Sequence, residues 1–155
     1  MTPTRTLTAH CTLSHRADGQ PLLTIDNQYA RAEISLFGAH VLSYQRHGEP
    51  ASIWLSDKAI LDGSKPIRGG IPLCWPWFGP SPARVGSGKP AHGFARTSLW
   101  TLDGVSDHGD GTLVHLSLRD SDASRALWHH AFELELDVLV GKELSLVLTT
   151  RNTGK

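Results

Sequence analysis

Apolar and polar residues alternate with a period of two over much of this chain. The clearest run covers residues 132–140, where apolar positions are separated by acidic ones: Phe132, Leu134, Leu136, Val138 and Val140 against Glu133, Glu135 and Asp137. Such alternation is typical of a strand with one face on a core and the other in solvent. Gly141-Lys142 is typical of a tight turn, and alternation resumes over 144–148. This part of the sequence therefore predicts an antiparallel hairpin.

Similar but shorter runs predict most of the remaining fold. We expect strands over residues 22–25, 30–36, 41–44, 53–55, 99–102 and 114–118. Only Ser121–Leu127 has a helical pattern, and it is short. An all-β chain with this many strands indicates a sandwich of antiparallel sheets.

The segment from Lys65 to Arg96 breaks this pattern. It combines cations, an imidazole, a Gly-Gly pair, prolines and flat rings: Arg68, Arg84, Arg96, His92, Gly69, Gly70, Trp75, Trp77 and Phe78. Its prolines exclude an ordinary helix, and it lacks the alternation of a strand. Long irregular segments are usually functional or disordered, and the aromatics argue against disorder. We therefore interpret this segment as a binding surface.

Composition limits what the chain binds. Its 155 residues fit one domain, and 15 basic with 15 acidic side chains give a formal net charge of zero. A neutral chain has no global field to attract nucleic acid or an anionic membrane, so we expect neither partner. There is no apolar run of about 18 residues and no apolar core of a signal peptide at the start. Cys11 and Cys74 do not make a disulfide framework. We expect a reduced, cytoplasmic, monomeric protein.

The nine histidines do not indicate a metal site. His129 and His130 are adjacent and would point to opposite faces of a strand, and the others, His40 among them, lack the spacing of metal ligands. Scattered surface histidines are the simpler interpretation. No metal or cofactor is expected.

The end of the sequence predicts a continuation. Residues 144–150 have a strand pattern, and Asn152-Thr153-Gly154 is turn chemistry that usually leads into another strand. A sandwich that stopped there would leave an open sheet edge. We expect a truncated chain, and a natural terminus that frays is the alternative.

Three blocks of the central segment carry a family resemblance. They are residues 67–72 (IRGGIP), 74–79 (CWPWFG) and 91–96 (AHGFAR), supported by residues 38–40, 54–56 and 61–66 upstream. In this order and spacing they resemble the hexose-6-phosphate mutarotases, the glucose-6-phosphate 1-epimerase branch of the aldose 1-epimerase family. The resemblance covers only the N-terminal part of the family's chain. Residues 1–155 are therefore expected to be the N-terminal part of one aldose 1-epimerase-like β-sandwich domain.

The resemblance implies a galactose mutarotase-like supersandwich, here incomplete, and an isomerase that interconverts the α and β anomers of hexose 6-phosphates. A base takes the proton of the anomeric hydroxyl while an acid protonates the ring oxygen, so the ring opens, one bond rotates and the ring recloses. In the family the acid is a histidine and the base a glutamate, and both are expected beyond Lys155. The 155-residue chain alone is accordingly expected to be inactive.

The resemblance also implies the recognition residues. Arg68 and Arg96 match positions that hold the substrate's phosphate, a role that suits a planar, permanently charged guanidinium. For a single arginine a solvated or ion-paired surface charge would be the preferred interpretation, and it is the presence of both inside matched blocks that favours phosphate binding. His92 matches a pocket-lining histidine that assists the main acid; the alternative is a histidine that only holds its loop. Ala91 departs from members that carry a substrate-binding glutamine there.

The remaining residues of the segment have structural expectations. Gly69 and Gly70 are expected to allow positive φ or close backbone approach. Of Trp75, Trp77 and Phe78, at least two are expected to pack in a core or clamp a loop, and a wall against the sugar stays open for them.

Two functions remain open. The first is the isomerase, with this chain supplying the phosphate and sugar recognition half. The second is a non-catalytic carbohydrate- or phosphosugar-binding β-sandwich.

Overall fold

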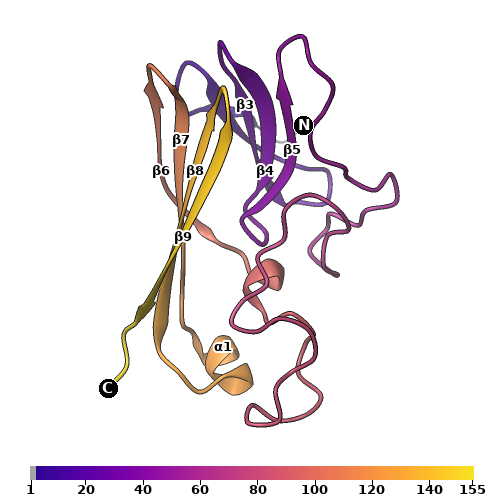
Figure 1. Cartoon of the computed structure of the whole chain (residues 1–155), viewed down its shortest axis with the longest axis vertical. Coiled ribbons are helices and arrows are strands. Elements are labelled where there is room, and N and C mark those ends of the chain that lie inside the picture. Colours follow the sequence, from indigo (N-terminus) through magenta and orange to yellow (C-terminus); the bar gives the residue numbers. More distant parts are fainter. Residues whose placement is uncertain (1–2) are drawn as a thin grey trace.

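Two antiparallel sheets form most of the regular structure of the computed structural model, which describes residues 3–155 (Figure 1). In both sheets each strand pairs with the next one along the chain, in the orders β1-β2-β3-β4-β5 and β6-β7-β8-β9. The strands are β1 (Arg5–Thr6), β2 (Cys11–His15), β3 (Pro21–Asp26), β4 (Ala30–Ser35), β5 (His40–Arg46), β6 (Thr101–His108), β7 (Gly111–Arg119), β8 (Phe132–Gly141) and β9 (Leu144–Asn152). The predicted all-β antiparallel fold is confirmed.

The hairpin predicted from the alternation is formed by β8 and β9. Val140 pairs with Leu144 across the turn, and the register continues to Phe132 opposite Asn152. All the apolar positions predicted on β8 are buried, and the acidic residues between them are half-buried. The period of two in the sequence therefore describes the two faces of β8 correctly.

The core lies between the two sheets. It is formed mainly by apolar residues of β3 and β4 on one side and of β7 and β8 on the other, including Leu23, Ile25, Ile34, Val114, Leu116, Leu134, Leu136 and Val138. Several hydrogen bonds join the sheets at one end. The Tyr44 hydroxyl donates to the Gly141 carbonyl at 2.8 Å, and Asn27 Nδ2 donates to the Val140 carbonyl at 2.8 Å. Buried polar groups paired in this way fix how one sheet sits on the other.

Some predicted elements differ from the structure. Residues 53–55 do not form a strand: Leu55 makes only an isolated bridge to Gly69. The strand expected at 99–102 begins at Thr101 and extends to His108, past a register shift between Leu102 and Gly104. The strands β1 and β2 were not predicted. The short helix is confirmed as α1 (Asp122–Leu127), where the Ser121 and Ser124 hydroxyls cap each other's backbone N–H groups.

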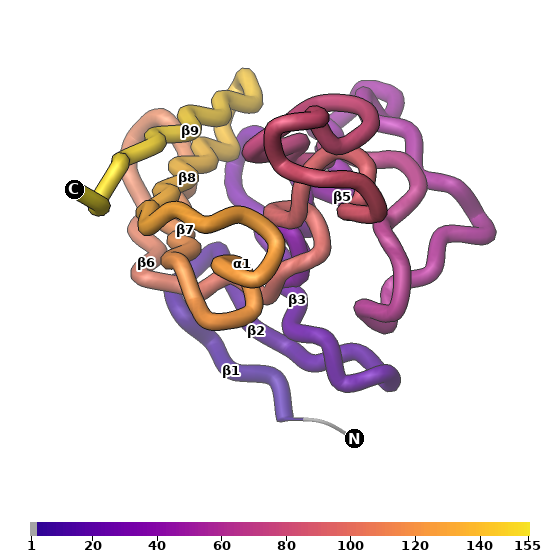
Figure 2. The backbone as a smooth tube through the Cα atoms, turned by 90° about the horizontal axis from the view of Figure 1, so that it is seen from below, coloured from indigo at the N-terminus to yellow at the C-terminus, as the bar shows by residue number. Residues whose placement is uncertain are grey.

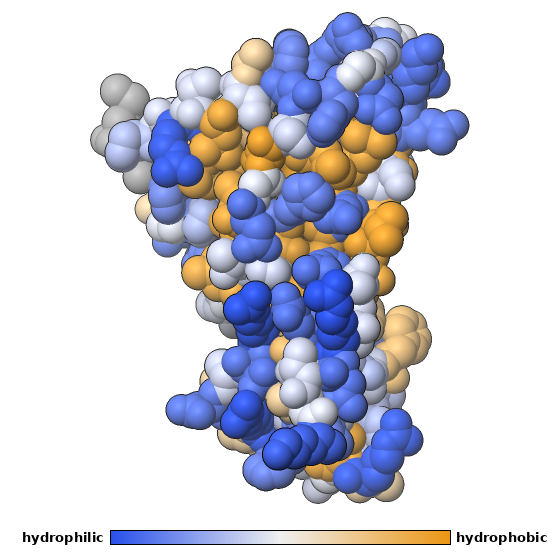
Figure 3. All heavy atoms as spheres, turned by 90° about the vertical axis from the view of Figure 1, so that its left-hand side faces the viewer, coloured by the Kyte–Doolittle hydropathy of each residue, from blue (hydrophilic) through white to orange (hydrophobic). Residues whose placement is uncertain are grey.

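The irregular segment and the second sheet lie on opposite sides of the molecule. In Figures 1 and 2 the chain between β5 and β6 runs along one side, ending in the 3₁₀ turn η1 (Ala95–Thr97), while β6–β9 occupy the other. Figure 3 shows the β6–β9 side, where apolar side chains gather above a band of hydrophilic ones. Ion pairs occur on that side, among them Arg119 with Glu133 and Arg151 with Glu135.

Two further findings concern the cysteines and the question of a membrane-spanning helix. Cys11 and Cys74 are both free thiols, Cys11 buried and Cys74 half-buried. Within residues 3–155, no helix has the length and apolar character needed to cross a membrane.

Candidate functional site

The central segment is irregular, but backbone hydrogen bonds tie it to β5, to the preceding loop and to itself. The Ile71 N–H donates to the Val41 carbonyl at 2.9 Å, and the Gly70 N–H donates to the Trp54 carbonyl at 2.8 Å. Further along, the Phe94 N–H donates to the Trp75 carbonyl at 2.9 Å. Backbone groups that are paired in this way give the loop a defined conformation. The segment is thus a fixed surface.

Two glycines make the first of these contacts sterically feasible. Gly69 and Gly70 both have positive φ, 102° and 67°. A Cβ on Gly70 would lie 2.5 Å from the Val41 carbonyl oxygen and 2.6 Å from Nε2 of His40, and one on Gly69 would lie 2.8 Å from the Trp54 carbonyl oxygen. The expectation of positive φ and close backbone approach is confirmed at both positions.

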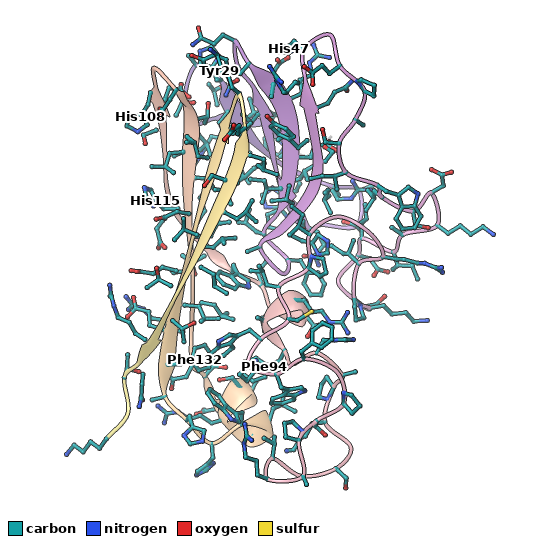
Figure 4. The ribbon with its side chains drawn as sticks, viewed as in Figure 1. Tyr29, His47, Phe94, His108, His115 and Phe132 are labelled. Atoms are coloured by element: carbon teal, nitrogen blue, oxygen red, sulfur yellow. The ribbon has the colours of Figure 1, made fainter. Side chains whose placement is uncertain are left out.

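Two of the three aromatics anchor the segment, as predicted. Trp75 packs against Phe94, Trp128 and Phe132, with ring centroids 5.8, 5.2 and 4.6 Å away. Figure 4 shows Phe94 and Phe132 lying together between the segment and β8. Trp77 is buried and its Nε1 donates to the Pro90 carbonyl at 2.9 Å. Phe78 is 80% exposed and meets only the edge of the His92 ring in an aromatic pair, at 4.8 Å.

Arg68 presents an uncommitted guanidinium. It is exposed, and within residues 3–155 its side chain makes neither a hydrogen bond nor an ion pair. Its carbonyl accepts the Ser56 N–H at 3.1 Å, so the backbone is held while the side chain is free. A fixed base with a free charged end suits capture of an anion from solvent.

Arg96 is half-buried at the other end of the segment, on η1. One terminal nitrogen donates to the Ala91 carbonyl at 3.0 Å, and Nε is buried without a partner in the part of the chain that the structure describes. It faces no carboxylate within ion-pairing distance among those residues. The contact with Ala91 places this guanidinium next to the backbone of His92.

The arginines of the segment differ from most of those elsewhere in the chain, with Arg5 as the exception. Six others are ion-paired with carboxylates: Arg16, Arg31, Arg46, Arg119, Arg125 and Arg151. Residues 65–96 contain five Lys or Arg and no Asp or Glu. The sequence left open that Arg68 and Arg96 are solvated or ion-paired surface charges. An ion pair is excluded for both among residues 3–155. The segment is a local positive surface on a neutral chain.

His92 is held in one tautomer by its loop. The Gly79 N–H donates to His92 Nδ1 at 3.0 Å, and the His92 N–H donates to the Gly79 carbonyl at 2.8 Å. Because Nδ1 accepts a hydrogen bond, the neutral ring carries its own proton at Nε2. His92 also has a positive φ of 64°, which is uncommon for a residue with a side chain. The ring therefore offers a hydrogen-bond donor in a fixed orientation.

The expectation that the other histidines lie on the surface is wrong for His40. Only 1% of His40 is exposed, and its Nε2 lies 2.7 Å from the Gly69 carbonyl oxygen. Burial lowers the pKa of His40, and the charge of Arg96 lowers it further, although the hydrogen bond to Gly69 opposes both effects. The sequence carried a signal: His40 stands in the apolar run LFGAHVL, where a buried side chain is expected.

The segment from Gly38 to His40 brings the two arginine blocks together. The Gly38 N–H donates to the Ser98 carbonyl at 2.7 Å, and a Cβ on Gly38 would lie 2.6 Å from the Arg96 carbonyl oxygen. Two residues later His40 contacts Gly69, the neighbour of Arg68. Since Arg96 also contacts Ala91, the predicted residues Arg68, Arg96 and His92 belong to one continuous set of contacts.

Two cavities lie near this set without including it. One, of about 310 Å³, is lined by Arg84, Lys89, Arg125, Trp128, His129 and His130 among others. The second, of about 530 Å³, lies between η1, α1 and β8. In residues 3–155 no three His, Cys, Asp or Glu side chains cluster as metal ligands would. Neither cavity is lined by Arg68, His92 or Arg96, so these three residues stay the predicted candidates for the site, linked by the contacts through Gly38, His40 and Ala91.

The fold and this face match a known family. The family described as aldose 1-epimerase matches residues 21–155, which is most of the chain. The chain therefore belongs to the aldose 1-epimerase family, as the three blocks predicted.

Individual relatives support this family assignment. The chain is 38% identical over 133 residues to an Escherichia coli (strain K12) protein whose name describes it as a proposed glucose-6-phosphate 1-epimerase, covering 86% of this chain and 44% of that protein. A Cenchrus ciliaris protein of the same name is 36% identical over 130 residues, covering 79% and 38%. The crystal structure of a proposed mutarotase from Salmonella typhimurium superposes with a TM-score of 0.89 at 34% identity, covering 97% and 50%. The chain thus spans about half the length of the relatives it matches.

Proposed function

We propose that this chain is the N-terminal, substrate-recognition part of an enzyme that interconverts the α and β anomers of a hexose 6-phosphate. Arg68 and Arg96 bind the phosphate in this proposal, and His92 donates a hydrogen bond to an oxygen of the sugar. Family membership favours this isomerase over a non-catalytic sugar-binding sandwich. The names of the relatives support the phosphorylated substrate.

The observation that carries the proposal is that Arg68 and Arg96 lie in the matched blocks and have no carboxylate partner within residues 3–155, a property that they share with Arg5 and Arg84. A phosphate dianion needs several charge-assisted donors, and guanidinium groups supply them in matching planar pairs. Six arginines elsewhere already use that capacity on Asp or Glu. Arg68 and Arg96 keep it available on a face that contains no acidic residue in its own segment.

Phosphate binding suits the chemistry of anomer exchange. The phosphate lies at C6, away from C1, so holding it leaves the anomeric carbon free to open, rotate and reclose. Its binding energy is equal in the ground state and the transition state, so it lowers KM more than it raises kcat. The arginines are thus recognition residues, and the proton transfers belong to an acid and a base elsewhere in the protein.

His92 contributes a neutral donor in this scheme. Its Nδ1 accepts from Gly79, so placing a second proton on the ring would break that hydrogen bond. The Nε2–H can steady a sugar hydroxyl or the ring oxygen without leaving the imidazole. We therefore assign His92 to substrate orientation and not to proton transfer.

Magnetisation-exchange NMR of glucose 6-phosphate tests the proposal. With the full-length enzyme, exchange between the two anomeric protons should be much faster than in buffer. The 155-residue chain alone should bind glucose 6-phosphate in a calorimetric titration and leave the exchange rate unchanged. An exchange rate equal to that of buffer with the full-length protein would exclude the isomerase.

A further inference from the structure

His40 is a buried imidazole whose two nitrogens have different surroundings. It is the first residue of β5 and 1% exposed. Its Nε2 lies 2.7 Å from the Gly69 carbonyl oxygen, which can only accept a hydrogen bond. The proton of the neutral ring must therefore be on Nε2, and Nδ1 is left as a lone-pair acceptor.

That acceptor has no partner within residues 3–155. Only one other side-chain nitrogen or oxygen there is both buried and unpaired, and it is Nε of Arg96. An arginine Nε always carries a hydrogen and is always a donor. One buried acceptor and one buried donor remain, and leaving either of them unpaired costs its full desolvation penalty.

The two residues are also neighbours. The backbone around Gly38 is in contact with that of Arg96, and His40 is two residues further along. The positive charge of Arg96 is close enough to act on the His40 ring. Because both atoms are shielded from solvent, a substrate cannot reach either of them. Each is the natural partner of the other.

We infer that His40 is a positioning residue for the phosphate-binding arginines: one ordered water accepts from Arg96 Nε–H and donates to His40 Nδ1, while His40 Nε2–H holds the Gly69 carbonyl. One imidazole then joins the two loops that carry Arg68 and Arg96 and fixes their separation. The inference rests on the proposed function for the identity of the ligand. The hydrogen bonds themselves do not depend on it.

Glutamine and leucine at position 40 separate this role from simple packing. His40→Gln keeps a donor for Gly69 and an acceptor for Arg96, whereas His40→Leu fills the space with neither. Calorimetric titration of the full chain should show a dissociation constant for glucose 6-phosphate raised at least about 10-fold in His40→Leu, and within about 3-fold of wild type in His40→Gln. Leu23→Ala, in the main core, controls for destabilisation alone and should bind normally.

A spectroscopic measurement tests the hydrogen bonds of His40 even if no phosphosugar binds. In ¹⁵N-histidine NMR spectra, His40 should show a protonated Nε2 and an Nδ1 shifted by an accepted hydrogen bond. Arg96→Lys removes Nε–H and should move that Nδ1 resonance toward the value of a free acceptor. An unmoved resonance would overturn the inference, as would equal affinities in His40→Leu and wild type. Absence of binding by wild type would contradict only the proposed function.

Discussion

The Gly79 N–H donates to Nδ1 of His92, and this one hydrogen bond fixes which nitrogen of the imidazole faces outward as a donor. Asparagine at position 92 isolates that function, because it tolerates positive φ and its Oδ1 can replace Nδ1 as the acceptor. It has no counterpart of the Nε2–H. We predict that His92→Asn lowers kcat/KM for glucose 6-phosphate by roughly 10-fold, the effect of one lost hydrogen bond.

The control for His92→Asn is the pH dependence of kcat. If His92 only orients the sugar, both limbs of the profile remain and the melting temperature stays within a few degrees of wild type. Loss of one limb would mean that His92 transfers a proton, contrary to its assignment here.

Removal of a phosphate-binding guanidinium should affect phosphorylated substrates selectively. We predict that Arg96→Ala raises KM for glucose 6-phosphate by roughly 10- to 100-fold, since charge-assisted hydrogen bonds contribute about 1.5–3 kcal/mol each, and that it leaves any turnover of glucose almost unchanged. Steady-state anomer exchange with both sugars measures this. Arg151→Ala is the matched control, because Arg151 already pairs with Glu135 at 3.4 Å on the other sheet. Equal losses for both sugars would refute the phosphate assignment.

The strands that the sequence predicted correctly are those whose two faces meet different surroundings. On β8 one face meets the opposite sheet and the other meets solvent, so polarity alternates. Residues 53–55 alternate for another reason: Ile53 packs against the main core, Leu55 against a smaller cluster, and Trp54 between them is 66% exposed. Periodicity reports which side chains are buried, and a strand also needs a partner, which this stretch lacks.

Some residues of the candidate site could be predicted from the sequence, and one residue beside them could not. Arg68, His92 and Arg96 were predicted from local sequence blocks, because all three lie in one recognisable segment. His40 was not predicted as a site residue because its proposed role comes from its neighbours Gly69 and Arg96, which lie in two loops that are distant in sequence. Spacing rules for metal ligands do not detect a histidine that works alone between backbone and guanidinium groups.

The two cysteines should differ sharply in reactivity. Burial, with a smaller contribution from the charge of Asp107, raises the pKa of Cys11 from 9.0 to about 11. The thiolate is the reactive form, so at pH 8 iodoacetamide should modify Cys74 while native Cys11 stays unmodified until urea unfolds the chain. Peptide mass spectrometry after timed labelling measures both sites. Equal labelling rates in the native protein would show that Cys11 is not shielded.

The same pKa predicts an alkaline loss of stability. Between pH 9 and 11 the unfolded chain releases the Cys11 proton while the folded chain retains it, so the free energy of unfolding falls as pH rises through that window. The loss approaches roughly 2 kcal/mol at pH 11, since one pKa unit corresponds to about 1.36 kcal/mol. Cys11→Ala lacks this group, and urea unfolding of both proteins at pH 8 and pH 10.5 should show a smaller decrease for the variant. Parallel decreases would assign the effect to other groups.

Gly70 and Gly48 form a matched pair for testing how the site is held. Both have positive φ, 67° and 78°, but a Cβ on Gly70 would lie 2.5 Å from the Val41 carbonyl oxygen and 2.6 Å from His40, whereas one on Gly48 has nothing within 4 Å. A left-handed backbone costs an alanine about 1–2 kcal/mol at either position. Overpacking adds a further 1–3 kcal/mol at Gly70 alone. Urea unfolding should therefore show Gly70→Ala to be clearly less stable than Gly48→Ala.

Because the clash pushes on His40 and the Arg68 loop, Gly70→Ala should also weaken glucose 6-phosphate binding, and Gly48→Ala should not. Similar stabilities and affinities in the two variants would mean that the loop can move away from β5 at little cost.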